Sequence, residues 1–434
     1  MTSSWLERDF NHLWHPYTRF STLHAHRLPV IVSANGIYLH DDQGRTFIDA
    51  ISSWWSCSLG HSHPDIVHAI QEQTAQLQHS ILGNLTHPQA IRLAERLARL
   101  MPTPDRHVLF ASDGASAIEQ AIKIAVQYRT NLGQPPRTRF ACFSASYHGD
   151  TLGGMSLGYL ETFHRPFADL LFKAQRLPLP HCPPSCLDHS SCPQTCLDGL
   201  LERLRPIAHE LAAFVVEPLI QGAAGMNLYG PWALARIAHW CREHDVLLIV
   251  DEIATGFGRT GSLFAFEHAH IDPDIVCLGK ALTAGSLPLS ATIARDRFYH
   301  TFSDRDDDHT LQHGHTFCGN PIACAAANAA LDHYQDPSFL PRIRERAAQL
   351  RESLLPLRAH PHVQHVHTFG LIGIVRLQPE AEPLAHRIRE TLFDRGVLLR
   401  PLGPVLYLMP PLVITREELD NLLHLFHATL QEIS

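Results

Sequence analysis

Short apolar runs alternate with longer amphipathic segments along most of the chain. The apolar runs predict buried strands at residues 108–111, 139–143, 214–217, 247–252 and 274–280. The longer segments predict helices at residues 64–79, 88–100, 115–128, 231–244 and 320–334. Strands and helices that alternate in this way predict an α/β fold, in which helices cover both faces of a mostly parallel central sheet.

The C-terminal part of the chain has a different pattern. Its predicted elements are helices at about 338–355 and 380–395, strands near 371–377, 397–400 and 405–408, and a last helix at 416–432. Helices and short strands that do not alternate regularly are typical of a smaller α+β domain.

We therefore expect three parts. Residues 1–60 form an N-terminal segment that packs with the small domain and the active site, residues 61–330 form the large domain, and residues 331–434 form the small C-terminal domain. The longest irregular stretch, residues 177–198, is rich in Pro, Cys, Ser and His. We expect it to be an insertion loop of the large domain.

Composition narrows the class of protein. The chain has 434 residues, of which 45% are hydrophobic, so it can bury a large core. The net charge of −8 and the absence of a basic block disfavour nucleic acid as a partner. The sequence shows neither an N-terminal signal pattern nor an apolar run that could span a bilayer. We expect a soluble cytoplasmic protein with no membrane partner.

The ten cysteines fall into two groups. Six lie in apolar contexts that are typical of small core residues: Cys57, Cys142, Cys241, Cys277, Cys318 and Cys324. The other four form a cluster: Cys182, Cys186, Cys192 and Cys196. Four thiols this close could hold zinc, but the familiar spacing of two residues between cysteines is missing. We expect no metal in the active site. For this loop two alternatives stay open: bound zinc, or cysteines that are reduced or paired with one another.

Two predicted strands end in charged residues of opposite sign. One ends in Asp251 and the other in Gly279 and Lys280. Ligands of open α/β sheets bind at the carboxyl ends of the strands. An amine there can form a Schiff base and a carboxylate can hold a pyridinium nitrogen, which is the pair that pyridoxal phosphate (PLP) requires. Two ordinary strands could also end in charges, but the glycine-rich turn at 256–261 favours the cofactor, because glycines let the backbone approach a flat ring.

Three turns could complete a cofactor site. The segment 112–116 lies between a strand and a helix, so its N–H groups could bind phosphate, although helix capping alone explains its residues. After another strand, Tyr147 could stack on a pyridine ring and Asp150 could receive a substrate amine. The hydroxyl of Thr316 could also bind phosphate, or cap the helix that follows.

Aromatic and basic residues elsewhere could bind a substrate. Tyr17 and Trp54 lie in aromatic N-terminal segments, which otherwise pack between subunits or domains. Arg400 is either a solvated charge at a strand end or, with an acidic substrate, a carboxylate clamp.

Taken together, these motifs resemble the class III, fold-type I PLP-dependent aminotransferases over nearly the whole length. The resemblance is carried by Asp251–Glu252, by the glycine-rich turn at 256–261 and by Leu278–Gly279–Lys280. It implies the fold-type I architecture, PLP as cofactor and a homodimer with shared active sites.

The resemblance also implies roles for single residues. Lys280, Asp251 and Tyr17 would be catalytic, with Lys280 bound to the cofactor and Asp251 paired with the pyridinium nitrogen. The cofactor would further contact Gly114, Ala115, Tyr147, His315 and Thr316, the last two from the partner subunit. The substrate pocket would comprise Tyr17, Trp54, Tyr147, Asp150, Arg259, Lys280, Gly314 and Arg400, with Arg400 on a carboxylate and Arg259 in support.

Within the class, the chain is similar to the transaminases of biotin biosynthesis that make 7,8-diaminononanoate. The segments that carry this narrower match are residues 13–18, 53–55, 251–256, 319–328, 400–401 and 407–411. It implies that S-adenosylmethionine gives its amino group to 8-amino-7-oxononanoate. Gly314–His315 replaces the Gly-Pro of close relatives, which weakens the substrate assignment. Three alternatives stay open: another ω-aminotransferase, a lysine-dependent enzyme of the same pathway, and a non-catalytic scaffold with a metal-binding loop.

Overall fold

The computed structural model describes residues 4–20, 23, 28–180, 195–302 and 307–433. Its centre is a seven-stranded sheet with the order β4-β12-β11-β10-β7-β5-β6. Every neighbouring pair in this sheet is parallel except the two that involve β12. The strands are β4 (Arg106–Ala111), β5 (Arg139–Phe143), β6 (Gln175–Leu177), β7 (Leu211–Val216), β10 (Leu247–Asp251), β11 (Ile275–Leu278) and β12 (Ser290–Arg295).

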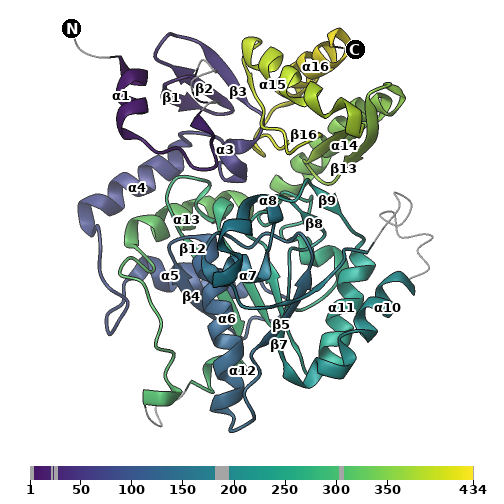
Figure 1. Ribbon diagram of the computed structural model, residues 1–434. Helices are drawn as coiled ribbons and strands as arrows, with labels where there is room; N and C mark the ends of the chain where they lie inside the picture. The colour runs from purple at the N-terminus through teal and green to yellow at the C-terminus, as the bar shows by residue number, and fades with distance from the viewer. Residues whose placement is uncertain (1–3, 21–22, 24–27, 181–194, 303–306, 434) are drawn as a thin grey trace.

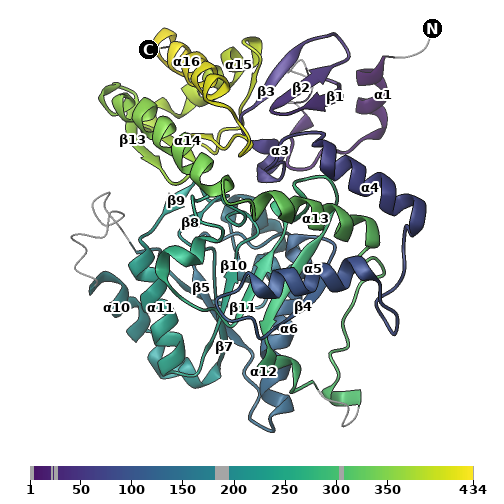
Figure 2. The same cartoon turned by 180° about the vertical axis from the view of Figure 1, so that it is seen from behind.

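Both faces of the central sheet are covered by helices, as the sequence predicts. Figure 1 shows α6 (Gly114–Asn131) and α7 (Leu152–Leu157) in front of the sheet. Figure 2, from behind, shows α5 (Pro88–Arg99) and α13 (Pro321–Tyr334) on the opposite face. The fold is therefore the layered α/β class expected of a parallel sheet.

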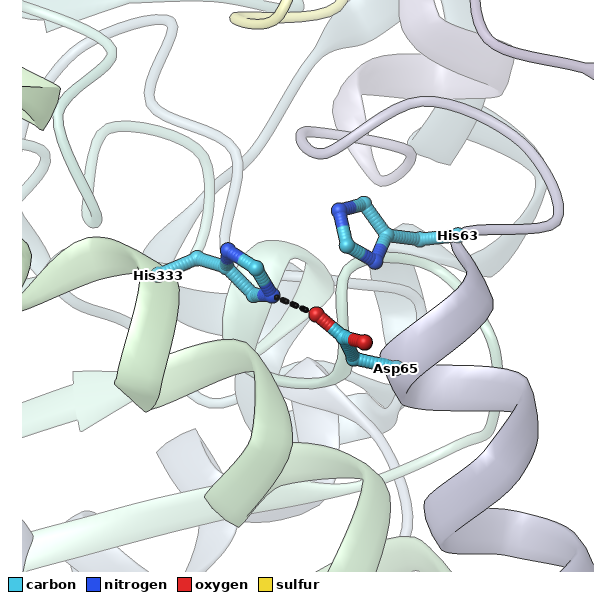
Figure 3. Close-up of side chains that lie close together, drawn as sticks. All are labelled: His63, Asp65 and His333. Carbon is cyan, nitrogen blue, oxygen red and sulfur yellow. Dashed lines mark hydrogen bonds and ion pairs between the residues drawn. The ribbon is translucent and has the colours of Figure 1, made fainter.

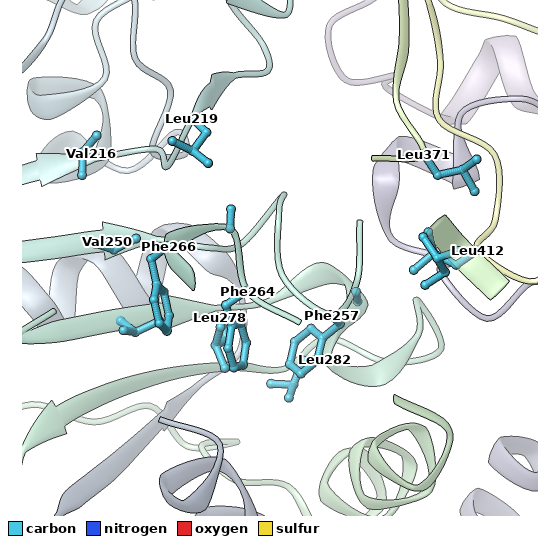
Figure 4. Packing of buried hydrophobic residues seen from close by; sticks show 14 of the residues in the cluster. Val216, Leu219, Val250, Phe257, Phe264, Phe266, Leu278, Leu282, Leu371 and Leu412 are labelled. Carbon is cyan, nitrogen blue, oxygen red and sulfur yellow. The ribbon is translucent and has the colours of Figure 1, made fainter. Parts of the chain in front are cut away.

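Successive residues of the central strands pack into two separate cores. Val250 belongs to the core that includes α5 and α13, whereas its neighbour Ile249 packs with residues of α6. Figure 4 shows part of the first core, in which Val216, Val250 and Leu278 lie near Phe264 and Phe266. Because side chains alternate across a strand, a strand buried on both faces must be apolar throughout. The sequence Leu-Leu-Ile-Val of β10 satisfies this condition.

Two smaller sheets lie together above the central one (Figure 1). The first combines β1 (Ile31–Asn35), β2 (Tyr38–Asp41) and β3 (Thr46–Asp49) with β15 (Val397–Leu398), which pairs in parallel with β3. The second contains β13 (Val363–Thr368), β14 (Gly373–Leu377) and β16 (Val405–Leu408). The N-terminal strands thus share a sheet with a strand from the C-terminal part of the chain.

The remaining helices and short strands complete these layers. They are α1 (Trp5–His12), α3 (Ser52–Trp55), α4 (Pro64–Gln76), α8 (Glu161–His164), α10 (Thr195–Glu202), β8 (Ile220–Gln221), β9 (Asn227–Leu228), α11 (Pro231–Glu243), α12 (Asp296–Tyr299), α14 (Phe339–Leu354), α15 (Glu382–Asp394) and α16 (Arg416–Glu432). In the part of the chain that the structure describes, none of the helices is long and apolar enough to cross a membrane.

Several strands were not expected from the sequence. β12 has the sequence Ser-Ala-Thr-Ile-Ala-Arg, and its small and polar residues do not form an apolar run, although all but the last are buried. β1 has mostly exposed residues, and β13 alternates only partly. Neighbouring strands stabilise all three, so their local sequences carry a weak signal.

Candidate active site

Lys280 and Asp251 meet at one edge of the central sheet, as the sequence predicts. β10 and β11 are adjacent and parallel, and Asp251 pairs with Cys277, three residues before the lysine. Both side chains line a cavity of about 470 Å³. Lys280 has a φ of 40° and begins a short 3₁₀ turn, so the backbone leaves the strand abruptly at this residue. This turn brings the amine to the carboxylate's side of the sheet edge.

A buried histidine supports Asp251. His148 Nδ1 donates to Asp251 Oδ2 at 2.7 Å, and the backbone N–H of Ile253 donates to Oδ1 at 3.0 Å. Burial would lower the pKa of His148, but the hydrogen bond and the negative charge of Asp251 raise it above its ordinary value. The hydrogen bond from His148 holds the Asp251 side chain, which is only 5% exposed, at the cavity wall.

The environment of Lys280 lowers the pKa of its amine. Burial lowers the pKa of Lys280, and the charges of Asp251 and Glu217 oppose this effect without cancelling it. Its Nζ lies 5.3 Å from the ring centroid of Trp55. A lysine that loses its proton more readily than an exposed one can act as a nucleophile toward a carbonyl and as a proton carrier.

The first turn of α6 also lines this cavity, through Gly114 and Ala115. The Asp113 carboxylate accepts from the N–H of Ser116 at 2.9 Å, so the cap leaves the N–H groups of Gly114 and Ala115 for a ligand. A Cβ at Gly149 would lie 2.3 Å from the Cβ of Ala115, and one at Gly114 would lie 2.9 Å from Ile253. Only glycine allows this close packing. The helix cap is present, and phosphate binding by the N–H groups of Gly114 and Ala115 stays a prediction.

A second cavity, of about 130 Å³, adjoins the first. The two share Trp55, Tyr147 and Lys280. Its other lining residues are Tyr17, Trp54, Phe163, Ala223, Arg400, Leu402 and Tyr407. All of these except Arg400 are aromatic or apolar. An elongated, mainly apolar substrate could therefore reach Lys280 through this cavity.

Arg400 is the basic residue that lines only the smaller cavity. Its Cζ lies 4.4 Å from the ring centroid of Trp54. Burial lowers the pKa of Arg400, and no carboxylate among the described residues forms an ion pair with it. A guanidinium that is partly desolvated and free of an acidic partner is suited to bind a substrate carboxylate.

Two phenols and a carboxylate are linked at the boundary between the two cavities, where Tyr17 lines the smaller one, Asp150 the larger one and Tyr147 both. Tyr147 donates its hydroxyl to Asp150 Oδ2 at 3.0 Å, and the hydroxyl of Tyr17 lies 3.5 Å from that of Tyr147. Burial, together with the hydrogen bond to Asp150, raises the pKa of Tyr17 to about 12. Both hydroxyls therefore keep their protons at neutral pH and remain hydrogen-bond donors.

A left-handed turn places Trp54 and Trp55 in the site. Residues Ser52, Ser53, Trp54 and Trp55 have φ values of 49°, 45°, 62° and 71°. The N–H of Trp55 still donates to the carbonyl of Ile51 at 2.9 Å. Each left-handed residue with a side chain costs about 1–2 kcal/mol, so the surroundings must stabilise the turn. Nothing in the sequence indicates it, because none of the four residues is glycine.

Four expected site residues lie outside both cavities. The guanidinium of Arg259 is buried and donates to the carbonyls of Pro410, at 2.7 Å, and Leu371, at 3.3 Å. Burial lowers the pKa of Arg259 to about 10. In the single chain it connects backbone segments and lines neither cavity. Gly314, His315 and Thr316 are exposed and also line neither cavity, so their roles stay predictions that require a second subunit.

Two residues of the site were not identified from the sequence, the carboxylate Glu217 and the histidine His148. Glu217, at the end of β7, accepts from the N–H groups of Tyr147, at 2.9 Å, and Gly222, at 3.2 Å. Burial raises the pKa of Glu217 to about 7. Its position directly after an apolar strand is the same signal that identifies Asp251. His148, within the Tyr-His-Gly turn, has no comparable signal, because only the fold brings it to Asp251.

The two cysteine groups have different outcomes. The six cysteines expected in the core are free and buried. Cys182, Cys186 and Cys192 lie outside the described residues, and the side chain of Cys196 is also outside them. Zinc in this loop therefore stays a prediction.

Known proteins resemble this chain over nearly its full length. The family model described as Aminotransferase class-III matches residues 21–430. An adenosylmethionine-8-amino-7-oxononanoate aminotransferase from Synechococcus elongatus is 40% identical over 430 residues, which cover 97% of this chain and 99% of that protein.

Two solved structures have the same fold. The enzyme of the same name from Methanocaldococcus jannaschii has a TM-score of 0.92 at 34% identity and covers 98% of each chain. An amine transaminase from an uncultivated Pseudomonas species, solved in a PLP-bound form, has a TM-score of 0.88 at 32% identity. The match covers 97% of this chain and 99% of that one.

Proposed function

We propose that this chain, which belongs to the class-III aminotransferase family, is a PLP-dependent transaminase. The observation that carries the proposal is that Lys280 and Asp251 face one cavity from the ends of adjacent parallel strands. That cavity continues into a second one with Arg400 in its wall. A pyridine aldehyde phosphate requires an amine for its aldehyde, a carboxylate for its ring nitrogen and N–H groups for its phosphate. Lys280, Asp251 and the start of α6 offer these groups around one cavity.

When bound, PLP supplies an aldehyde that takes up an amino group and a ring that withdraws electrons. The chain supplies the remaining functions. Lys280 would hold the aldehyde carbon, and its Nζ would hold and move a proton. Asp251, supported by His148, would hold the proton of the ring nitrogen. The N–H groups of Gly114 and Ala115 would bind the phosphate.

We assign S-adenosylmethionine as the amino donor and 8-amino-7-oxononanoate as the acceptor, which gives 7,8-diaminononanoate for biotin. The names of the relatives from Synechococcus elongatus and Methanocaldococcus jannaschii support this assignment. The smaller cavity supports the acceptor independently, because its aromatic walls suit a methylene chain and Arg400 suits the carboxylate at that chain's end.

We also propose a cytoplasmic homodimer with shared sites. Gly314, His315 and Thr316 are exposed in the single chain, where a second subunit could reach them. Exposed aromatic residues near the N-terminus support the same assembly: Trp5, Trp14 at 83% exposure, and Phe20. Apolar surface of this kind is typical of an interface.

The test uses purified holoenzyme with 8-amino-7-oxononanoate and one donor at a time. We expect S-adenosylmethionine to yield 7,8-diaminononanoate by mass spectrometry and lysine to yield none. Formation of product with lysine alone would refute S-adenosylmethionine as the donor but leave the assignment of the acceptor unchanged. Transfer from simple amines to many ketones, with no preference for oxononanoate, would refute the substrate assignment and indicate a general ω-aminotransferase.

A colour measurement separates the cofactor from the substrates. The holoenzyme should absorb in the visible range, and borohydride should fix the cofactor to the peptide that contains Lys280. Failure to bind PLP at all would refute the transaminase proposal itself.

A further inference from the structure

Three potential metal ligands converge where α4 meets α13. His63 immediately precedes α4, Asp65 lies in its first turn, and His333 lies in the last turn of α13. Figure 3 shows the three side chains pointing toward one another across the two helices. None of them lines either cavity of the active site.

The separations of the three groups suit a small cation. His333 Nε2 lies 2.9 Å from Asp65 Oδ2, and the rings of His63 and His333 have centroids 4.3 Å apart. One ligand atom from each residue lies within 4.8 Å of the others. Tetrahedral zinc, with bonds of about 2.0–2.2 Å, needs ligand atoms about 3.3 Å apart. Rotation of the side chains would have to supply the remaining difference.

The site is partly built for a ligand already. His63 Nδ1 is buried and has no hydrogen-bond partner, and a polar atom in that state normally requires an explanation. A cavity of about 460 Å³ lies alongside and is lined by both His63 and His333. The acid that lines this cavity, Glu345, is paired with Arg416 at 2.8 Å. The cavity leaves room for water as a fourth ligand.

We propose that His63, Asp65 and His333 bind a divalent transition metal, with zinc as the best candidate. Two imidazoles and one carboxylate suit zinc and its neighbours, whereas calcium and magnesium prefer oxygen ligands. Because the ligands come from distant parts of the sequence, the ion links the start of α4 to the end of α13. Binding to the folded chain alone raises its stability.

A second cluster provides a comparison within the same protein. One ligand atom from each of His107, Asp296 and His300 also lies within 4.8 Å of the others. However, the ring of His107 stacks on Tyr299, with centroids 3.8 Å apart and an interplanar angle of 1°. None of its ring nitrogens is buried without a partner. We assign no ion to this cluster.

The test uses holoenzyme in which Cys182, Cys186, Cys192 and Cys196 are replaced by serine, so that the loop cannot bind zinc. Zinc per chain is measured by equilibrium dialysis, and thermal unfolding is followed with and without zinc. We expect His63→Ala and His333→Gln each to lose one zinc per chain and the zinc-dependent rise in Tm. The control is His68→Gln, which removes an exposed histidine of α4 whose one ion pair among the described residues is with Glu72.

Crystals of the same protein soaked in zinc give an independent measurement that does not depend on the folding of variants. We expect an anomalous peak between His63, Asp65 and His333. Unchanged zinc content in the two variants, equal loss in the His68→Gln control, or anomalous peaks elsewhere but not here would each overturn the proposal.

Discussion

Replacing Arg400 by alanine tests whether the smaller cavity recognises a distant carboxylate. In 8-amino-7-oxononanoate the carboxylate and the reacting ketone are at opposite ends of a methylene chain. In S-adenosylmethionine the carboxylate is attached to the reacting carbon, beside Lys280. Since Arg400 lines only the smaller cavity, its removal should weaken the acceptor half-reaction more than the donor half-reaction.

The structure limits the size of the effect. The Arg400 side chain is half-buried, and it has no ion pair to lose among the described residues. The loss should therefore be that of hydrogen bonds to a charged group, about 1.5–3 kcal/mol, and not the larger cost of a broken buried pair. At about 1.4 kcal/mol for each tenfold change, this predicts a fall of roughly 10- to 150-fold in kcat/KM for the acceptor.

Single-turnover absorbance measurements separate the two half-reactions. Arg400→Lys keeps the charge but loses the planar pair of N–H groups and the contact with Trp54, so it should have an intermediate effect. Arg387→Ala removes an exposed arginine of α15 and should change neither half-reaction. Equal losses in both half-reactions, or a large fall in Tm, would show that Arg400 has a structural role and would refute the reasoning.

Four further predictions concern the cofactor, its supports and the cysteine loop. Lys280→Ala should abolish transamination while the protein still binds PLP non-covalently; turnover without added amine would contradict this. Asp251→Asn should slow both half-reactions by orders of magnitude, because a neutral amide does not stabilise the protonated ring nitrogen, and near-normal rates would count against it. Burial raises the pKa of Glu217 to about 7, so the folded protein keeps a proton that the unfolded chain releases above about pH 4.5. The free energy of unfolding should consequently fall between pH 5 and 7, and Glu217→Gln should reduce this slope in urea titrations; an unchanged slope would exclude Glu217 as its source. Serine at Cys182, Cys186, Cys192 and Cys196 should leave PLP binding and single-turnover transamination intact, whereas a folded variant with bound PLP and no chemistry would make the loop part of the site.

The amino-acid sequence by itself determines the central layers of this protein. Strands such as β10, up to Asp251, and β11 must be apolar because helices cover both faces, and this requirement is visible as an uninterrupted apolar run. The ends of the same runs identify Asp251 and Lys280, since ligands bind at the carboxyl ends of parallel strands. The glycines at 114 and 149 are visible as well, although only the structure shows which atoms they approach.

Only the tertiary structure decides how the substrate side of the site is assembled. Trp54 and Trp55 enter through a left-handed turn that no local signal indicates, and β12 forms only because β4 and β11 lie on either side of it. His148 reaches Asp251, 103 positions later in the chain, and Arg400 reaches Trp54 from the C-terminal part of the chain. Only the structure shows that the buried guanidinium of Arg259 donates to backbone carbonyls and lines neither cavity. Residues far apart in sequence become neighbours through packing that involves the whole chain, so their local patterns carry no record of the contact.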